Sequence, residues 1–515
     1  MEDQHSQATE KAEPDEKPVA TNSPPSKWQR RVQKFVWPIY ARFPNVIPDP
    51  YGNEKEYWRE RDVRENVETA LGEGVSLRLG CIMVSEIYGP NEIEALYRGL
   101  ERIGWDRGRA RDRDESNVDW LKGQRLYGAR GTLPLGWVRR QSEARRVVRL
   151  DYTADFPKEF SSLLVNIFQL TPSVTCLNVG FILTDAASLE YADEIDRPAQ
   201  TTRKSEKNWR SVSILNVPHV KQERVQRVRR KYRELGISWL SRHFPGFFAE
   251  QCERSHFPTT EILALEGFTP FDGDNAKDRT WTHWSRFVNI DHEFDTWTCS
   301  SLSSLRFSLK PGPRDSIPNH ITVALRCDTL TEEDKKHYGD FSLSSQVYFT
   351  KERVGGIVAK HALAGYLREL LRNLKETRQS LSLRTKSHRS TYEVTRISAF
   401  FRRSIGVPSV AREVLALSED DASFQWDATG FTSQVYPGEN ETYEIKDALK
   451  SFLGRLAQQL LEEDQDTREF LNQLSSAMGT KESIAAQKRM EWVAGLALLV
   501  SAISLAFAIH SGFPQ

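Results

Sequence analysis

The spacing of hydrophobic residues predicts alternating strands and helices in the first part of the chain. Residues 75–87 alternate well enough between apolar and polar side chains to predict a half-buried strand. A helix is predicted next, because apolar residues recur every three or four positions from Ile93 to Ile103. The same reasoning predicts a helix over Phe160–Phe168 and strands at 147–152, 174–183 and 212–217. Strands that alternate with helices favour an α/β domain over residues 45–217.

One tract inside this domain has little hydrophobic periodicity. Residues 107–146 are dense in arginine, glycine and acidic side chains. Such a composition offers little to bury, so a long insertion or surface loop is expected there.

A basic helix and a β-rich region are predicted over residues 218–354. The helix begins at Pro218 and carries many basic residues between Lys221 and Arg233. Two interpretations are open: a phosphate-rich partner, nucleic acid or anionic lipid, or a solvated face whose charges pair with acids from elsewhere in the protein. Farther along, residues 305–309 and 321–325 alternate as two adjoining strands would.

Residues 355–478 are predicted to be mainly helical, apart from a polar loop at 420–440. Leu363–Leu374 keeps helical spacing, and a further helix is predicted over Val394–Phe401. Apolar residues then step by three or four from Ile445 to Leu460. This amphipathic helix packs either on Leu363–Leu374 of the same chain or on a second copy of the protein, which makes a homo-oligomer a possible state.

The last hydrophobic pattern is an uncharged run near the C-terminus. As a helix, Trp492–Ile509 covers about 27 Å, just enough for a hydrocarbon layer of about 30 Å. A transmembrane helix is therefore predicted over residues 490–509, with a short tail at 510–515. The alternative is a buried C-terminal helix of a soluble domain, which would normally keep one polar face. The predicted anchor residues are Trp492, Leu496, Leu499, Ile503 and Phe507, flanked by Lys488 and Arg489.

The flanking charges predict the orientation of this span. Basic residues precede it and no charged residue follows it, so the positive-inside bias keeps the N-terminal bulk in the cytoplasm. Residues 1–26 are hydrophilic, should be disordered and lack the apolar core of a signal peptide. The predicted location is thus a membrane, crossed once, with membrane lipid as the partner of the C-terminal span.

Residues 27–44 form a basic, aromatic segment with amphipathic spacing. Apolar steps of four and three predict a short helix, which Pro38 ends or kinks. The segment is either a second, interfacial contact with the membrane or a stretch whose aromatic side chains pack on the following domain.

Overall charge and cysteine content narrow the class of protein. Lys and Arg together number 71, as do Asp and Glu, so the net charge does not support nucleic acid as a partner. The five cysteines lie far apart without a C-x-x-C motif and are typical of reduced thiols in a reducing compartment.

The sequence offers one weak candidate for a metal site and no catalytic motif. A phosphate-binding loop and a G-x-S-x-G elbow are absent, no cofactor is indicated, and His292-Glu293 lacks the second histidine of a zinc motif. The weak metal candidates are His283, Asp291, Glu293 and Asp295. Any acidic loop produces such a run, so a solvated turn is the alternative.

These observations predict an α+β protein with a mixed α/β part, a β-rich middle, a helical C-terminal part and one C-terminal transmembrane helix. The favoured function is non-enzymatic: a membrane-tethered cytoplasmic binding, scaffold or regulatory protein with a possible protein partner. Two alternatives remain, namely a membrane-bound, divalent-metal-dependent hydrolase or nuclease that uses residues 283–295, and a subunit of an oligomeric channel or transporter.

Overall fold

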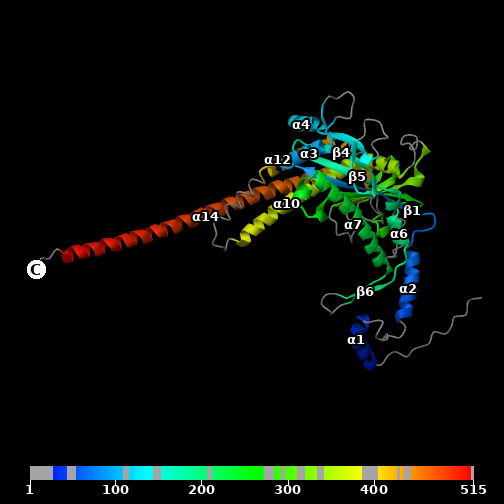
Figure 1. Ribbon diagram of the computed structural model, residues 1–515, viewed down its shortest axis with the longest axis horizontal. Coiled ribbons are helices and arrows are strands. Elements are labelled where there is room, and N and C mark those ends of the chain that lie inside the picture. Colours follow the sequence, from blue (N-terminus) through cyan, green and yellow to red (C-terminus); the bar gives the residue numbers. More distant parts are fainter. Residues whose placement is uncertain are drawn as a thin grey trace, which may run out of the picture. The chain divides into compact units, whose positions relative to one another are not determined.

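A computed structural model describes most of the chain, which divides into two compact units (Figure 1). The described residues are 27–42, 54–107, 115–142, 152–205, 212–271, 284–291, 296–309, 319–332, 342–384, 404–425, 430–433 and 442–511. Unit one comprises Met1–Val67 and Ala199–Val220, and unit two comprises Glu68–Pro198 and Lys221–Gln515.

The described residues of unit one form helices and a hairpin. The helices are α1 (Lys27–Arg42) and α2 (Glu54–Glu68), and β6 (Thr202–Ser205) pairs antiparallel with β7 (Val212–Leu215). Polar side chains of α2 hold the chain that leads into this hairpin. The Asn66 side chain accepts from the Ala199 N–H at 2.9 Å and donates to the Ala199 carbonyl at 2.7 Å, and Asp62 accepts from the Thr201 N–H at 2.9 Å.

Unit two is built on a ten-stranded mixed sheet with the strand order β12-β9-β10-β11-β8-β1-β5-β4-β2-β3. The strands are β1 (Ser76–Tyr88), β2 (Gly131–Arg140), β3 (Tyr152–Ala154), β4 (Phe160–Thr171), β5 (Val174–Leu183), β8 (Thr259–Glu266), β9 (Thr296–Cys299), β10 (Leu302–Ser308), β11 (His320–Arg326) and β12 (Phe431–Ser433). Neighbours are antiparallel except for the pairs β8–β11 and β2–β3. Strands from both predicted regions, 45–217 and 218–354, thus join in one sheet.

The remaining elements are mostly helices. They are α3 (Ile93–Arg102), α4 (Asn117–Tyr127), α5 (Asp185–Ser188), α6 (Glu190–Asp196), α7 (Val217–His243), α8 (Phe247–Gln251), α10 (Leu343–Arg384), α12 (Val407–Glu419), α13 (Asp421–Gln425) and α14 (Ile445–Ser511). The described residues also include the short 3-10 turns η2 (Arg254–His256), η4 (Trp284–Arg286) and η5 (Cys327–Thr329).

Helices α7 and α10 cover opposite faces of the sheet, as two residues of β5 demonstrate. The Asn178 side chain donates to the Gly355 carbonyl of α10, whereas the Phe181 ring lies edge-on to Trp239 of α7, with centroids 5.7 Å apart. Residues an odd number of positions apart on a strand point to opposite faces. Every residue of β5 is accordingly buried, and the sheet forms the middle layer of unit two.

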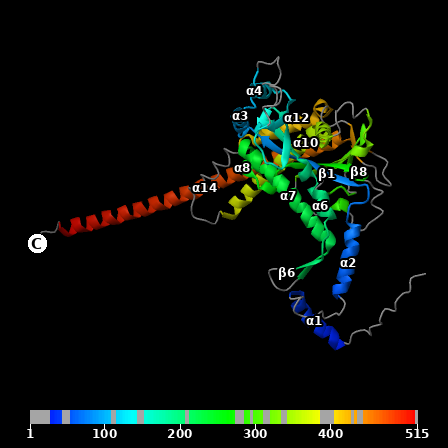
Figure 2. The same cartoon turned by 45° about the vertical axis from the view of Figure 1, so that its right-hand side comes forward.

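Helix α14 begins within this unit by packing on α10 and α12 (Figure 1 and Figure 2). The apolar side chains that it buries are Ile445, Leu449, Leu453, Leu456, Ala457, Leu460 and Leu471. Arg378 of α10 adds an ion pair with Glu463 at 2.8 Å. Of the two interpretations of the Ile445–Leu460 stripe, the structure shows the packing within the same chain.

Several other predicted elements are confirmed within one or two residues. These are the strands at 75–87, 174–183 and 212–217, the helix from Ile93, and the basic helix near Pro218. The two strands at 305–309 and 321–325 are neighbours as predicted, with Leu305 opposite Leu325 and Phe307 opposite Val323.

The helix predicted over Phe160–Phe168 is wrong, because this segment is strand β4. Almost all of β4 is buried, since layers of protein cover both of its faces. A strand buried on both faces reads as a continuous apolar run, and periodicity alone does not separate it from a buried helix.

The loops and helix ends were predicted less well. The surface loop expected over 107–146 contains α4 and β2, and the loop expected over 420–440 contains α13 and β12. Helix α10 begins well before residue 355, α14 continues through Gly479, and α1 continues through Pro38. The tail 1–26, the helix at Val394–Phe401 and most of the strand at 147–152 lie outside the described residues.

The α+β class is confirmed, whereas the transmembrane part of the fold prediction is not. In the described portion of the chain, no helix has an apolar stretch long enough to cross a membrane. The side chains of Leu505 to Ile509, including the predicted anchor residue Phe507, lie outside the described part of α14.

Candidate functional site

The C-terminal part of α14 leaves the core of unit two and exposes its hydrophobic side chains. Among the described side chains of α14, Leu471 is the last one that is buried. Beyond it, Trp492 is 76% exposed and Leu498 is 73% exposed. From Trp492 onward, the other described large hydrophobic residues that are exposed are Val493, Leu496, Leu499, Val500 and Ile503. We call residues 492–504 the apolar segment.

This apolar segment has no polar face. At about 100° per residue, its large hydrophobic side chains occupy roughly 220° of the helix circumference. The other positions are Ala, Gly and Ser. Both serine hydroxyls are used within the helix, since Ser501 donates to the Ala497 carbonyl and Ser504 to the Val500 carbonyl, each at 2.9 Å.

Between Leu471 and the apolar segment, most of the described side chains of α14 are polar and exposed, although the hydrophobic residues Ile484 and Met490 are exposed as well. We call residues 472–491 the stalk; its last turns carry Lys488 and Arg489, both exposed. Four of the predicted anchor residues have described side chains: Trp492, Leu496, Leu499 and Ile503. They lie on one helix, shortly after the basic residues Lys488 and Arg489.

The predicted metal site is described at only one of its four residues. Asp291 follows η4 and pairs with Arg286, whose Nε lies 2.5 Å from Asp291 Oδ2. The other three candidates, His283, Glu293 and Asp295, lie outside the described residues. Among the described side chains, no group of three or more His, Cys, Asp or Glu residues is arranged to hold a metal ion.

Sequence reasoning did not find the buried ionic cluster around Glu261 of β8. Arg229 of α7 donates to both carboxylate oxygens of Glu261, at 2.6 and 2.9 Å, and the Tyr191 hydroxyl donates at 2.9 Å. Thr322 of β11 donates at 3.0 Å. Burial opposes the charge of Glu261, but Arg229 and His320 outweigh it and lower the pKa of this carboxyl group.

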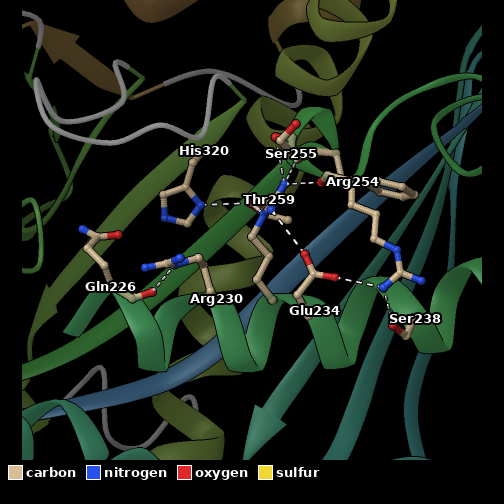
Figure 3. Close-up of polar contacts among 10 residues, drawn as sticks. Gln226, Arg230, Glu234, Ser238, Arg254, Ser255, Thr259 and His320 are labelled. Atoms are coloured by element: carbon tan, nitrogen blue, oxygen red, sulfur yellow. Dashed lines mark hydrogen bonds and ion pairs between the residues drawn. The ribbon is translucent and has the colours of Figure 1, made fainter. Parts of the chain in front are cut away.

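A second arginine of α7 lies one turn farther along the same helix. Arg233 donates to Thr259 Oγ1 at 3.2 Å and to the carbonyls of Arg254 and Ser255 at 2.7 and 3.0 Å. Figure 3 shows this region, where Thr259 also contacts the His320 ring, with Oγ1 2.9 Å from Nδ1. On the surface beside it, Arg254 donates to Glu234 at 3.0 Å and to Ser238 at 3.2 Å.

These contacts show where the basic side chains of α7 lie and which groups they pair with. Lys221, Arg229 and Arg233 are buried, and two of the remaining bases pair with acids of α6: Lys231 with Glu190, and Arg224 with Glu194. Arg224, Arg229 and Lys231 thus pair with acids from other elements, as one interpretation predicts, but the burial of Lys221, Arg229 and Arg233 shows that this part of the helix is not the solvated face that was expected. Because Glu261 and Arg229 are wholly shielded from solvent, the cluster does not offer a binding surface.

The cysteines are free thiols, as the sequence predicts. Burial raises the pKa of both Cys252 and Cys327 to about 12. A thiol is nucleophilic only as its thiolate, so neither residue is reactive at neutral pH.

The chain has no significant match to any protein-family model, curated protein or solved structure.

Proposed function

We propose that this chain is a non-enzymatic, membrane-tethered binding or scaffold protein whose bulk is cytoplasmic. The observation that carries the proposal is the exposure of the apolar segment on every side of α14. Trp492, Leu498 and their neighbours would be unfavourably placed in water, since a helix that is hydrophobic all round belongs in a protein core or a membrane. A lipid bilayer covers such a segment completely.

The internal bonding of the apolar segment supports the same conclusion. Helical backbone satisfies its own polar groups, and the hydroxyls of Ser501 and Ser504 are bonded to carbonyls of the same helix. No charged side chain has to be moved into hydrocarbon between Trp492 and Ile509. Lys488 and Arg489 would stay at the cytoplasmic surface.

The stalk gives the tether a defined length. A continuous helix over residues 472–491 spans about 30 Å at about 1.5 Å per residue. The polar side chains described along it are exposed and can remain in water. The tether would therefore hold the α/β/α layers of unit two away from the bilayer, where a partner protein can reach them.

Substitution of the apolar segment tests the tether. The nine strongly apolar residues of 492–509 favour insertion by about 3–5 kcal/mol in total, whereas two central lysines cost about 5–7 kcal/mol. We expect the wild-type chain to stay with membranes during alkaline carbonate extraction and Leu496→Lys/Leu499→Lys to be released. Leu126→Lys/Tyr127→Lys, on an equally exposed part of α4, is the matched control and should stay with the membranes. Retention of the double-lysine variant after extraction would disprove the tether.

A further inference from the structure

Helix α1 of unit one carries a second exposed hydrophobic surface. Trp28 is 72% exposed and Phe35 is 78% exposed, and Val32 and Ile39 are exposed as well. At about 100° per residue, these four side chains fall within roughly 60° of the helix circumference. We call them the α1 stripe.

The opposite side of α1 is already covered by protein. Tyr40 is buried, Trp37 is half-buried, and their ring centroids lie 5.9 Å apart. Both residues lie roughly 120–180° around the helix from the α1 stripe. The aromatic side chains of this segment thus divide between a face that packs on the protein and a face that remains exposed.

Positive charge borders the α1 stripe. Lys27, Arg31 and Lys34 are exposed and lie together along one flank of it. The helix has the sequence KWQRRVQKFVWPIYAR, which contains five basic residues and no acidic one. A surface that complements α1 must therefore be apolar at its centre and negatively charged at its edge.

We propose that α1 lies in the interface of a membrane rich in anionic lipids. The α1 stripe would enter the boundary between headgroups and acyl chains, and Lys27, Arg31 and Lys34 would contact lipid phosphates. Trp28, at the start of the stripe, is a residue type that favours this depth. A peptide groove would match the apolar stripe, but the unbroken positive charge favours a lipid surface. This site is separate from the tether and does not depend on it.

Vesicle flotation of the full chain tests the site. The double variant Leu496→Lys/Leu499→Lys serves as the parent, because it removes insertion by the apolar segment without touching the core. We expect the parent to float with phosphatidylcholine vesicles that contain about 30% phosphatidylserine and to remain unbound with phosphatidylcholine alone. Salt at about 1 M, where the Debye length is about 3 Å, should weaken this binding strongly.

Substitutions in α1 separate its two contributions. Adding Phe35→Glu to the parent should weaken binding at least about tenfold, and adding Lys34→Glu should weaken it about 5- to 30-fold. The matched controls Leu126→Glu and Lys158→Glu change an exposed hydrophobic residue and an exposed lysine of unit two and should leave binding unchanged. All four variants should keep the circular dichroism spectrum of the parent.

Three results would overturn the proposal. They are absence of binding to anionic vesicles, equal binding to neutral and anionic vesicles, and α1 variants that bind as the controls do. If α1 binds a protein and not lipid, no binding to anionic vesicles should be seen. These results would not change what is expected from carbonate extraction of the wild-type chain. The proposed tether is therefore tested independently of the α1 site.

Discussion

Glu86 of β1 is a buried carboxyl group whose protonation is linked to folding. Its oxygens accept from the N–H groups of Phe248, Ala249 and Ile87, at 2.8, 3.0 and 3.0 Å. Burial raises its pKa to about 8, although these donors favour the charged form. Folded protein therefore keeps a proton on Glu86 at neutral pH that the unfolded chain releases.

This linkage predicts how the stability of the protein changes with pH. The folded pKa lies above the ordinary value of 4.5, so the contribution of Glu86 is fully present below that value and is lost as the pH rises through about 8. Across this window it lowers the free energy of unfolding by at most about 1.4 kcal/mol per pH unit. Glu86→Gln should flatten the slope measured by urea unfolding between these pH values, and Glu94→Gln, on the exposed face of α3, should not. Equal slopes for Glu86→Gln and wild type would contradict the assignment.

Not every residue-level feature could be predicted from the sequence. The apolar segment was found because an uncharged run of this length is visible without knowledge of the fold. The pairing of Arg229 with Glu261 depends on two elements that are distant in sequence, and no local pattern marks it. The exposed side of α1 also needed the structure, because sequence periodicity placed Trp28 and Phe35 on one face without showing whether that face was covered.

Among the elements, α7 lies close to the sheet because it has a glycine at the point of contact. A Cβ atom on Gly236 would lie 3.0 Å from a methyl group of Val84 and 3.2 Å from the ring of Phe181. Both neighbours belong to central, fully buried stretches of β1 and β5 and have little room to move. The packing of the α7 layer therefore depends on this residue.

Two glycine-to-alanine substitutions separate this packing from helix propensity. Overpacking at Gly236→Ala should cost about 2–3 kcal/mol, which exceeds the gain of about 1 kcal/mol in helix propensity, so we expect a net loss of stability of about 1–2 kcal/mol. Gly479→Ala lies in the stalk, where nothing is within 4 Å of the added atom, and should not lower stability. Thermal unfolding of both variants measures the difference. Similar melting temperatures would show that α7 adjusts its position without cost.

Element types were predictable where one side of the element faces a different environment from the other. The helical steps after Ile93 predicted α3 correctly, because α3 buries one face. Strand β1 was predicted from its first residues, Ser76–Leu79, where half-buried and buried positions alternate, although the rest of the strand is buried. Strand β4 was mistaken for a helix because its residues are buried on both faces and the run carries no period-two signal. Other strands could not be predicted because they depend on pairing between distant parts of the chain. Strand β12, for example, joins the sheet through β9, which is far away in sequence.

At the scale of the whole molecule, α14 links the core of unit two to the apolar segment. Its buried part ends at Leu471, and its apolar segment starts at Trp492. The stalk contributes nothing to the hydrophobic core, so cutting it should leave unit two folded. The proposed binding site on α1 lies on the same side of the cut as unit two.

Cleavage of the stalk therefore tests how the two proposed membrane contacts work together. With a specific protease sequence in place of residues 476–482, cleavage on membranes of phosphatidylcholine alone should release a folded fragment directly. On membranes with about 30% phosphatidylserine, release should also need high salt, because α1 still binds the surface. Adding Phe35→Glu should abolish the salt requirement, whereas Leu126→Glu should not. A fragment that stays bound in high salt, or melts at a markedly lower temperature than the intact chain, would show that the stalk is not a simple spacer.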